Sequence, residues 1–130
     1  MKTNLYEHVE FHSAKVEDAP AIAQLRKKIW STTYRGIYPD EMIDQFDLEW
    51  HTQKDAQRIQ NPDDAVYLIK REERVIGYIT LHNSHPPHLL SLYLEDEFQN
   101  CGIGHKAMEF VKKRMEQTYD NMEFLASMNG

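Results

Sequence analysis

Residues 89–115 place an apolar run, a polar loop and a glycine-containing helix start in direct succession. The run LLSLYL has the character of a strand, and Gly102 and Gly104 open a segment with apolar residues at helical spacing. The first turn of a helix leaves backbone N–H groups without partners and carries a partial positive charge. Because glycine has no Cβ, a phosphate can approach the backbone closely at such a turn. The sequence therefore predicts an anion-binding loop between a strand and a helix.

The hydrophobic pattern around this stretch predicts a single mixed α/β domain over residues 1–130. Strands are expected at 9–14, 65–69, 75–81, 89–94 and 122–127, and helices at 17–30, from 40, at 48–60 and at 102–119. The last helix, of about 18 residues and 27 Å, is expected to join strands 89–94 and 122–127 as parallel neighbours. The acidic residues 95–97 are interpreted as a solvated turn, with attraction of a cationic amine substrate as the alternative.

Composition narrows the class of protein. The formal charge of −6 argues against general nucleic-acid binding, which favours a basic surface. The single cysteine, Cys101, cannot form a disulfide within the chain, which is typical of a reducing compartment. The N-terminus MKTNLYEHVE lacks the apolar core of a signal peptide, and no apolar run approaches the roughly 20 residues of a membrane span. We therefore expect a cytoplasmic protein that binds neither nucleic acid nor membrane.

Two motifs fit the glycines. Gly102, Gly104 and Ala107 match G-x-G-x-x-A, a form of the dinucleotide-binding fingerprint. The context opposes this reading, because residues 95–101 separate the strand from the first glycine and only one expected strand follows the helix. The second motif is Q-x-x-G-x-G at residues 99–104, placed between a strand and an amphipathic helix.

With this second motif the chain resembles the GNAT superfamily of acyl-CoA-dependent N-acetyltransferases, whose central motif is [QR]-x-x-G-x-[GA]. The segments AKVEDAPAIAQL, TYRGIYPDEMI and VIGYITL resemble the first helix, the following loop and helix, and the strand before the motif strand. The resemblance covers residues 11–127. It implies a GNAT-type mixed central sheet flanked by helices, here lacking the usual C-terminal helix and closing strands.

The resemblance also implies a binding site for acetyl-CoA as co-substrate. In the family the pyrophosphate lies on the amides of the loop and helix start, and the pantetheine arm pairs with the motif strand like an added strand. Here these positions are the loop and helix start Gln99, Asn100, Cys101, Gly102, Ile103, Gly104, His105 and Lys106, and the strand residues Leu92, Tyr93 and Leu94.

The implied reaction is direct transfer of the acetyl group to a primary amine of a small molecule or peptide. A backbone N–H at Leu94 is the expected donor to the developing oxyanion. His88 stands where many relatives carry a glutamate, and an imidazole with a pKa near 6.5 can act as the base. In similar enzymes a tyrosine on a further helix, after the strand that 122–127 resembles, often protonates the thiolate, and that helix has no counterpart in this sequence. The alternatives are therefore an acyl-CoA-binding protein without useful catalysis, a site completed by a second subunit, or a fragment of a longer protein.

Three further features complete the predictions. The loop at residues 31–39 suggests acceptor contacts from Tyr34, Arg35 and Tyr38, since loops often carry function. His82, His85 and His88 have H-x-x-H-x-x-H spacing, but two prolines interrupt them and no nearby Cys or carboxylate completes a set, so no metal is expected. An exposed edge on strand 122–127 would favour pairing with another chain, which makes a homodimer possible.

Overall fold

The computed structural model describes residues 8–84, 86–99 and 102–129, with side chains as far as residue 117. Four strands form one sheet in the order β1-β2-β3-β4, and each neighbouring pair is antiparallel. They are β1 (Val9–Ser13), β2 (Asp64–Arg71), β3 (Arg74–His82) and β4 (His88–Leu94). The predictions for His85, Asn100 and Cys101 fall outside the described residues.

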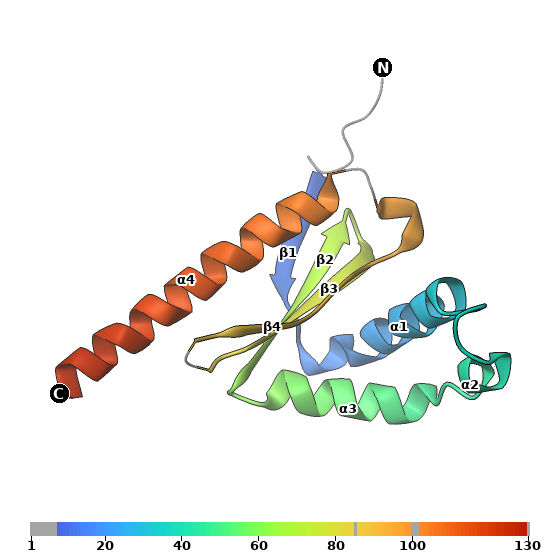
Figure 1. Cartoon of the computed structure of the whole chain (residues 1–130), viewed down its shortest axis with the longest axis horizontal. Helices are drawn as coiled ribbons and strands as arrows, with labels where there is room; N and C mark the ends of the chain where they lie inside the picture. Colours follow the sequence, from blue (N-terminus) through green and yellow to red (C-terminus); the bar gives the residue numbers. More distant parts are fainter. Residues whose placement is uncertain (1–7, 85, 100–101, 130) are drawn as a thin grey trace, which may run out of the picture.

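Helices cover both faces of the sheet (Figure 1). On one face lie α1 (Ala19–Thr33) and α3 (Leu48–Gln60), joined by the short α2 (Asp40–Asp44). The long α4 (Ile103–Asn129) crosses the other face, and 3-10 turns stand at Val16–Asp18 and Asp96–Phe98. The α/β fold expected from the sequence is thereby confirmed, whereas one domain over 1–130 stays a prediction. Within the described part of the chain, no helix is long and apolar enough to cross a bilayer.

Each helix layer packs on the sheet through its own apolar cluster. On the α1 side, one stripe of the helix (Ile22, Leu25, Ile29) meets Val66, Leu68 and Tyr78. On the α4 side, Ile103, Ala107 and Val111 pack with Ile69, Ile76 and Ile79 among others. The helical spacing seen in the sequence accounts for both stripes, since residues three and four apart share a face.

The prediction of a strand at 122–127 is wrong, because α4 continues through this segment to Asn129. No glycine or proline interrupts the chain between Gly104 and Gly130, and the apolar positions Val111, Met115 and Met122 keep a helical spacing. The expected parallel pairing of 89–94 with 122–127 is therefore also wrong. The edge strands of the described sheet are β1 and β4.

The pairing of β4 with β3 determines on which side of the sheet each β4 side chain lies. It pairs Gly77 with Leu94 and Thr80 with Ser91, but a bulge then shifts the register so that Leu81 pairs with Leu89. A Cβ at Gly77 would lie 2.3 Å from the Tyr93 carbonyl oxygen, so only glycine permits β4 to run this close. The side chains of Ser91 and Tyr93 face the α1–α3 side of the sheet.

Candidate active site

The outer edge of β4 presents backbone groups that no described strand covers. The N–H of Glu95 donates to the Ile76 carbonyl oxygen at 2.9 Å, which directs residues 95 and 93 toward β3. In an antiparallel strand, the backbone N–H and C=O groups of successive residues point to opposite edges of the strand. The backbone groups of Leu92 and Leu94 therefore point away from β3, toward the uncovered edge. This edge can take an extended partner by strand-like pairing.

The loop after β4 is tied to the end of the strand by the motif glutamine. The Gln99 Nε2 donates to the Leu94 carbonyl oxygen at 3.1 Å. Gly102 has a φ of +90°, a left-handed conformation that disfavours any side chain. Ile103 is fully buried and anchors the start of α4 in the core. The first-turn amides of α4 therefore stand beside the carboxyl end of β4.

The side chains of this first turn leave space for a ligand. A Cβ built at Gly104 would meet its nearest atom, the Leu94 Cδ1, at 3.9 Å, an ordinary contact distance. The exposed His105 ring lies beside Glu109, with Nε2 and Oε1 at 3.1 Å. The backbone N–H of Lys106 donates to the Gly102 carbonyl oxygen at 3.2 Å, so helical bonding begins there. The amides before it are the N–H groups that an anion can use.

The acidic turn departs from the sequence interpretation. Glu95 is only 4% exposed, so it is no solvated side chain. Its Oε2 receives a hydrogen bond from the Arg74 guanidinium at 2.7 Å, and Lys28 of α1 pairs with the other oxygen. A buried carboxylate is stable when cations compensate its charge. Glu95 therefore fastens the end of β4 to α1 and β3.

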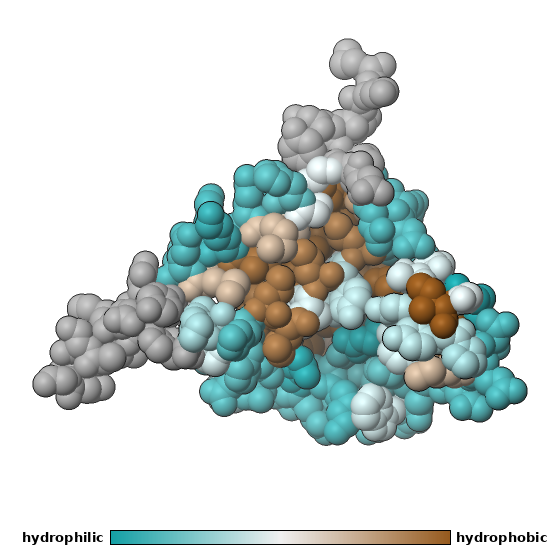
Figure 2. Space-filling view, in the orientation of Figure 1, coloured by the Kyte–Doolittle hydropathy of each residue, from teal (hydrophilic) through white to brown (hydrophobic). Residues whose placement is uncertain are grey.

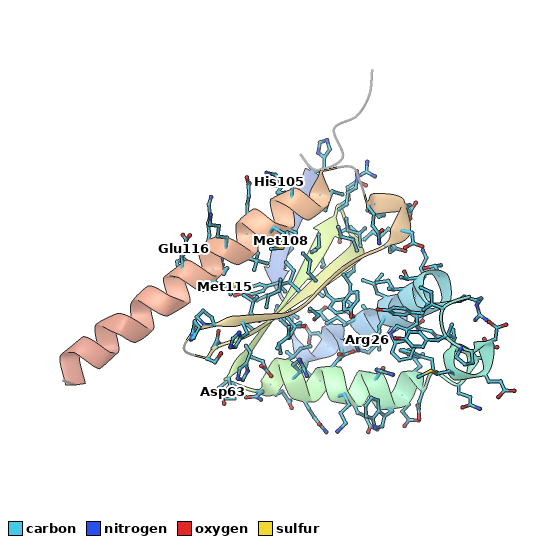
Figure 3. All side chains as sticks on the ribbon, in the orientation of Figure 1. Arg26, Asp63, His105, Met108, Met115 and Glu116 are labelled. Atoms are coloured by element: carbon cyan, nitrogen blue, oxygen red, sulfur yellow. The ribbon has the colours of Figure 1, made fainter. Side chains whose placement is uncertain are left out.

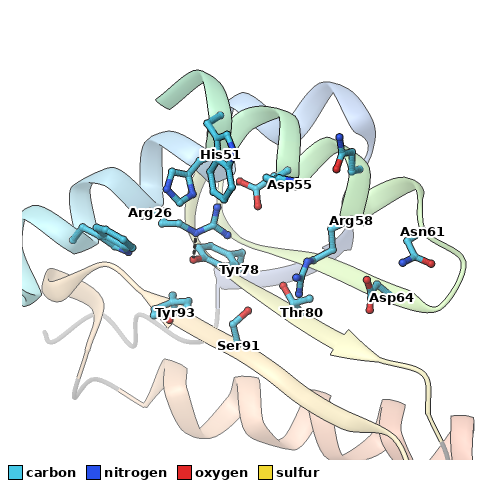
Figure 4. A pocket seen from close by; sticks show the side chains of 14 residues that line it. Arg26, His51, Asp55, Arg58, Asn61, Asp64, Tyr78, Thr80, Ser91 and Tyr93 are labelled. Atoms are coloured by element: carbon cyan, nitrogen blue, oxygen red, sulfur yellow. Dashed lines mark hydrogen bonds and ion pairs between the residues drawn. The ribbon is translucent and has the colours of Figure 1, made fainter. Parts of the chain in front are cut away.

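A polar cavity of about 510 Å³ opens between the α1–α3 layer and strands β3 and β4 (Figure 4). Tyr93 and Ser91 form its β4 wall, so it borders the open edge described above. Its other lining residues are Arg26, Trp30, Trp50, His51, Lys54, Asp55, Gln57, Arg58, Asn61, Asp64, Tyr78 and Thr80. A concave site with a few convergent polar groups suits a small polar ligand.

One end of this cavity rests on a buried ion pair. The Arg26 guanidinium donates to Asp55 Oδ2 at 2.6 Å and to the Tyr78 hydroxyl oxygen at 3.1 Å. Burial raises the pKa of Tyr78, so its hydroxyl stays neutral. Arg26 lies across the sheet from Met108 and Met115 of α4 (Figure 3). The network joins α1, α3 and β3 beneath the cavity.

His51 supplies an imidazole to the same cavity. Its ring stacks on Phe46 at 4.1 Å between centroids and meets Trp30 and Trp50 edge-on. Burial lowers the pKa of His51 below its ordinary value, and the Arg26 guanidinium lowers it further. The ring is consequently neutral near pH 7 and able to accept a proton.

The predicted acceptor loop lies beside Tyr93. Tyr34 and Tyr38 line a smaller cavity of about 230 Å³ together with Trp30, Met42, Ile43 and Tyr93. The nearby Tyr93 raises the pKa of the Tyr34 hydroxyl, chiefly by charge interaction and also by hydrogen bonding. Arg35 instead pairs with Asp40 at 3.2 Å and Asp44 at 2.7 Å. The loop thus brings its two tyrosines, but not its arginine, to a cavity.

His88 stands at the opposite end of β4 from Leu94. Six residues at about 3.3 Å each separate the two by roughly 20 Å. His88 is exposed and pairs with His82, whose Nδ1 lies 2.8 Å from Asp64 Oδ1. It does not line the larger cavity. Among the described residues, no three His, Cys, Asp or Glu side chains are grouped as metal ligands would be.

Residues 22–129 match the family model described as the acetyltransferase (GNAT) family. The chain belongs to the GNAT acetyltransferase family. This confirms the resemblance drawn from the glycine motif, and with it an enzyme that uses acetyl-CoA as acetyl donor and an amine as acceptor. GNAT membership also excludes the dinucleotide interpretation of the glycines.

Similar proteins agree with this assignment. The chain is 26% identical over 115 residues to a spermidine N(1)-acetyltransferase of Thermoplasma acidophilum, with 84% of this chain and 71% of that protein covered. The fold is similar to that of the PaiA N-acetyltransferase of the same organism in complex with coenzyme A, with a TM-score of 0.68, 24% identity and coverage of 84% and 72%. An aminoglycoside acetyltransferase from a soil metagenome, in complex with sisomicin, gives a TM-score of 0.60, 15% identity and coverage of 85% and 72%.

Proposed function

We propose that this GNAT enzyme acetylates a primary amine by direct attack of the amine on the thioester carbon of acetyl-CoA. The observation that carries the proposal is the outward Leu94 N–H, which lies between the glycine turn and the cavity beside Tyr93. The acyl-CoA arm pairs with the outward groups of Leu92 and Leu94, and its pyrophosphate meets the first-turn amides from Gly102 onward.

In this mechanism the C–N bond forms as the C–S bond breaks. The Leu94 N–H donates to the carbonyl oxygen as negative charge develops on it. The ammonium form of the acceptor loses one proton to the base before attack, and its nitrogen gives a second proton to solvent once the C–N bond has formed. Coenzyme A leaves as the thiolate, which solvent protonates. The smaller aromatic cavity, with Tyr34 and Tyr38, borders the acceptor on the other side of Tyr93.

Two histidines compete for the role of base. His88 is the residue suggested by the sequence, but it must act across about 20 Å of strand through water. His51 lines the cavity and carries a lowered pKa. We expect His51→Gln to lower kcat/KM by about 100-fold, a typical contribution of general-base catalysis, and His88→Gln to change it less than threefold.

The pH profile of kcat/KM checks the same assignment. A base with a lowered pKa stays deprotonated to lower pH, so the acid limb of wild-type activity should fall below the pH of about 6.5 typical of histidine. This limb should disappear in His51→Gln and remain in His88→Gln. If the acid limb disappears in His88→Gln alone, His88 is the general base.

The alternative is an acyl-CoA-binding protein that acts by interaction and has no useful turnover. The separation of His88 from Leu94 favours it, if His88 is the base. Calorimetric titration with acetyl-CoA followed by steady-state turnover on a panel of amines separates the two. Spermidine belongs in the panel, since a similar protein is a spermidine N(1)-acetyltransferase. Binding with acetylation supports the enzyme, binding alone supports the alternative, and absence of binding by folded protein contradicts both.

A homodimer and a cytoplasmic location stay predictions. The uncovered edge of β4 adjoins an apolar hollow of about 680 Å³ beside α4, lined in part by Leu89, Met108, Val111 and Met115. Apolar surface is visible between α4 and the sheet (Figure 2). Exposed apolar surface of this kind favours association between chains, and light scattering of the purified chain measures it.

A further inference from the structure

The larger cavity contains a guanidinium that no carboxylate of the described residues partners. Arg58 extends from α3 across the cavity toward Thr80 of β3 (Figure 4). Among the described side chains, no Asp or Glu lies within ion-pair distance of Arg58. The neighbouring Asp64 instead pairs with His82, at 2.8 Å between Oδ1 and Nδ1.

The other charges of the cavity leave its balance positive. Asp55 is neutralised by Arg26 at 2.6 Å, and Lys54 lies over the Trp50 ring with its Nζ 5.4 Å from the centroid. Arg58 and Lys54 are therefore cations without a carboxylate of their own in this cavity. Such a site attracts an anionic group and repels a second ammonium.

Two hydroxyls stand opposite the guanidinium. Thr80 is 3% exposed, and it pairs in register with Ser91 on β4. Both residues line the cavity, so Arg58 and the two hydroxyls converge from three elements. A guanidinium with neighbouring hydroxyl donors is the arrangement that a carboxylate prefers.

We propose that the acceptor of this enzyme carries a carboxylate, which Arg58, Thr80 and Ser91 hold while the distant amine reacts beside Leu94. This inference rests on the proposed function. Ser91 precedes Leu94 by three residues, about 10 Å along the strand. Allowing for a hydrogen bond of about 3 Å at the carboxylate, whose direction is not fixed along the strand, the carboxylate and the amine lie roughly 7–10 Å apart.

That separation selects a substrate class. An extended chain advances about 1.25 Å per bond, so about five to eight bonds lie between the amine nitrogen and the carboxyl carbon. An α-amino acid reacting at its own α-amine is too short. An ω-amino acid such as 6-aminohexanoate, or the terminal amine of a dipeptide, has the required length.

The test compares amines of equal length and different charge. Hexylamine, 6-aminohexanoate and 1,6-diaminohexane are assayed for acetylation by the wild-type enzyme. We expect kcat/KM to be at least about tenfold higher for 6-aminohexanoate than for hexylamine, chiefly through KM, with the diamine no better than hexylamine. A diamine acetylated as well as the amino acid would overturn the proposal. Failure with every amine would count against the proposed function instead.

Variants of the guanidinium locate the effect. Arg58→Gln should lower kcat/KM for 6-aminohexanoate by about 10- to 100-fold and leave hexylamine within twofold, whereas Arg58→Lys should recover part of the loss. Lys113→Gln, which removes an exposed cation from α4, should match wild type with both amines. If Arg58→Gln lowers kcat/KM equally for both amines, Arg58 has a structural role and does not bind a carboxylate.

A binding readout keeps the proposal testable without turnover. Trp30 and Trp50 line the cavity, so their fluorescence reports its occupation. We expect 6-aminohexanoate to change this fluorescence saturably in wild-type protein and at least about tenfold more weakly in Arg58→Gln. Folded wild-type protein that binds hexylamine as tightly as 6-aminohexanoate, or that binds neither, would contradict the proposed carboxylate site.

Discussion

Asp55→Ala should lower the free energy of unfolding by about 3 kcal/mol, the lower end of the range for breaking a buried ion pair. The Asp55 side chain is 8% exposed and that of Arg26 19%, so the alanine variant leaves a guanidinium confined beneath the cavity without its carboxylate. Domains of this size are stable by only about 5–15 kcal/mol, so the loss is a large fraction. Urea denaturation should show a midpoint lower by about 1–3 M.

Two variants separate the unpaired charge from simple loss of a side chain. Glu49→Ala removes an exposed carboxylate from the same helix and should change stability by less than about 0.5 kcal/mol. Combining Asp55→Leu with Arg26→Met removes both charges and should recover most of the loss. If Asp55→Ala unfolds no more easily than Glu49→Ala, the pair contributes nothing to stability.

Periodic segments were predictable from the sequence because burial imposes their pattern. The stripe Ile22, Leu25 and Ile29 indicated the helix at 17–30, and the strands expected at 65–69 and 75–81 are β2 and β3. The prediction of a strand at 122–127 failed for a physical reason. A short apolar run fits a strand or a helix equally, and its helical continuation from α4 decided the outcome.

The glycine motif gave the family, but the cavity residues come together only through the fold. Arg26 occupied the apolar stripe of α1, a signal that a buried partner was needed, yet nothing in the sequence pointed to Asp55, 29 residues away. Arg58 and Ser91 likewise line one cavity because α3 lies over the face of the sheet on which the Ser91 side chain stands. Spacing along a chain cannot reveal contacts between separate elements.

The interpretation of Glu95 as a solvated residue failed for the same reason. Its neighbours Asp96 and Glu97 are exposed, and in the sequence all three residues are equally acidic, so nothing there distinguished the buried one. Lys28 and Arg74, which compensate Glu95, lie on α1 and β3. The polarity of a side chain therefore predicted its environment only where no cation from another element reached it.

Gly104→Val should weaken acetyl-CoA binding by about 10- to 100-fold while the protein stays as stable as wild type. The space around Gly104 accepts a side chain, since the nearest atom to a Cβ is the Leu94 Cδ1 at 3.9 Å. Valine also has a higher helix propensity than glycine, so folding is not penalised. The branched side chain instead holds the pyrophosphate away from the first-turn amides, which costs a charge-assisted hydrogen bond of about 1.5–3 kcal/mol.

Calorimetric titration with acetyl-CoA measures the effect, and Gly104→Ala is the matched control. Alanine is permitted by the family motif at this position and has a higher helix propensity than valine or glycine, so folding is again not penalised and its affinity should stay within about threefold of wild type. Gly102 is a poorer site for the test, because its φ of +90° makes any substitution strain the backbone. Wild-type affinity in Gly104→Val would mean that the pyrophosphate does not lie on this turn, and the geometry built on the Leu94 amide would lose its anchor.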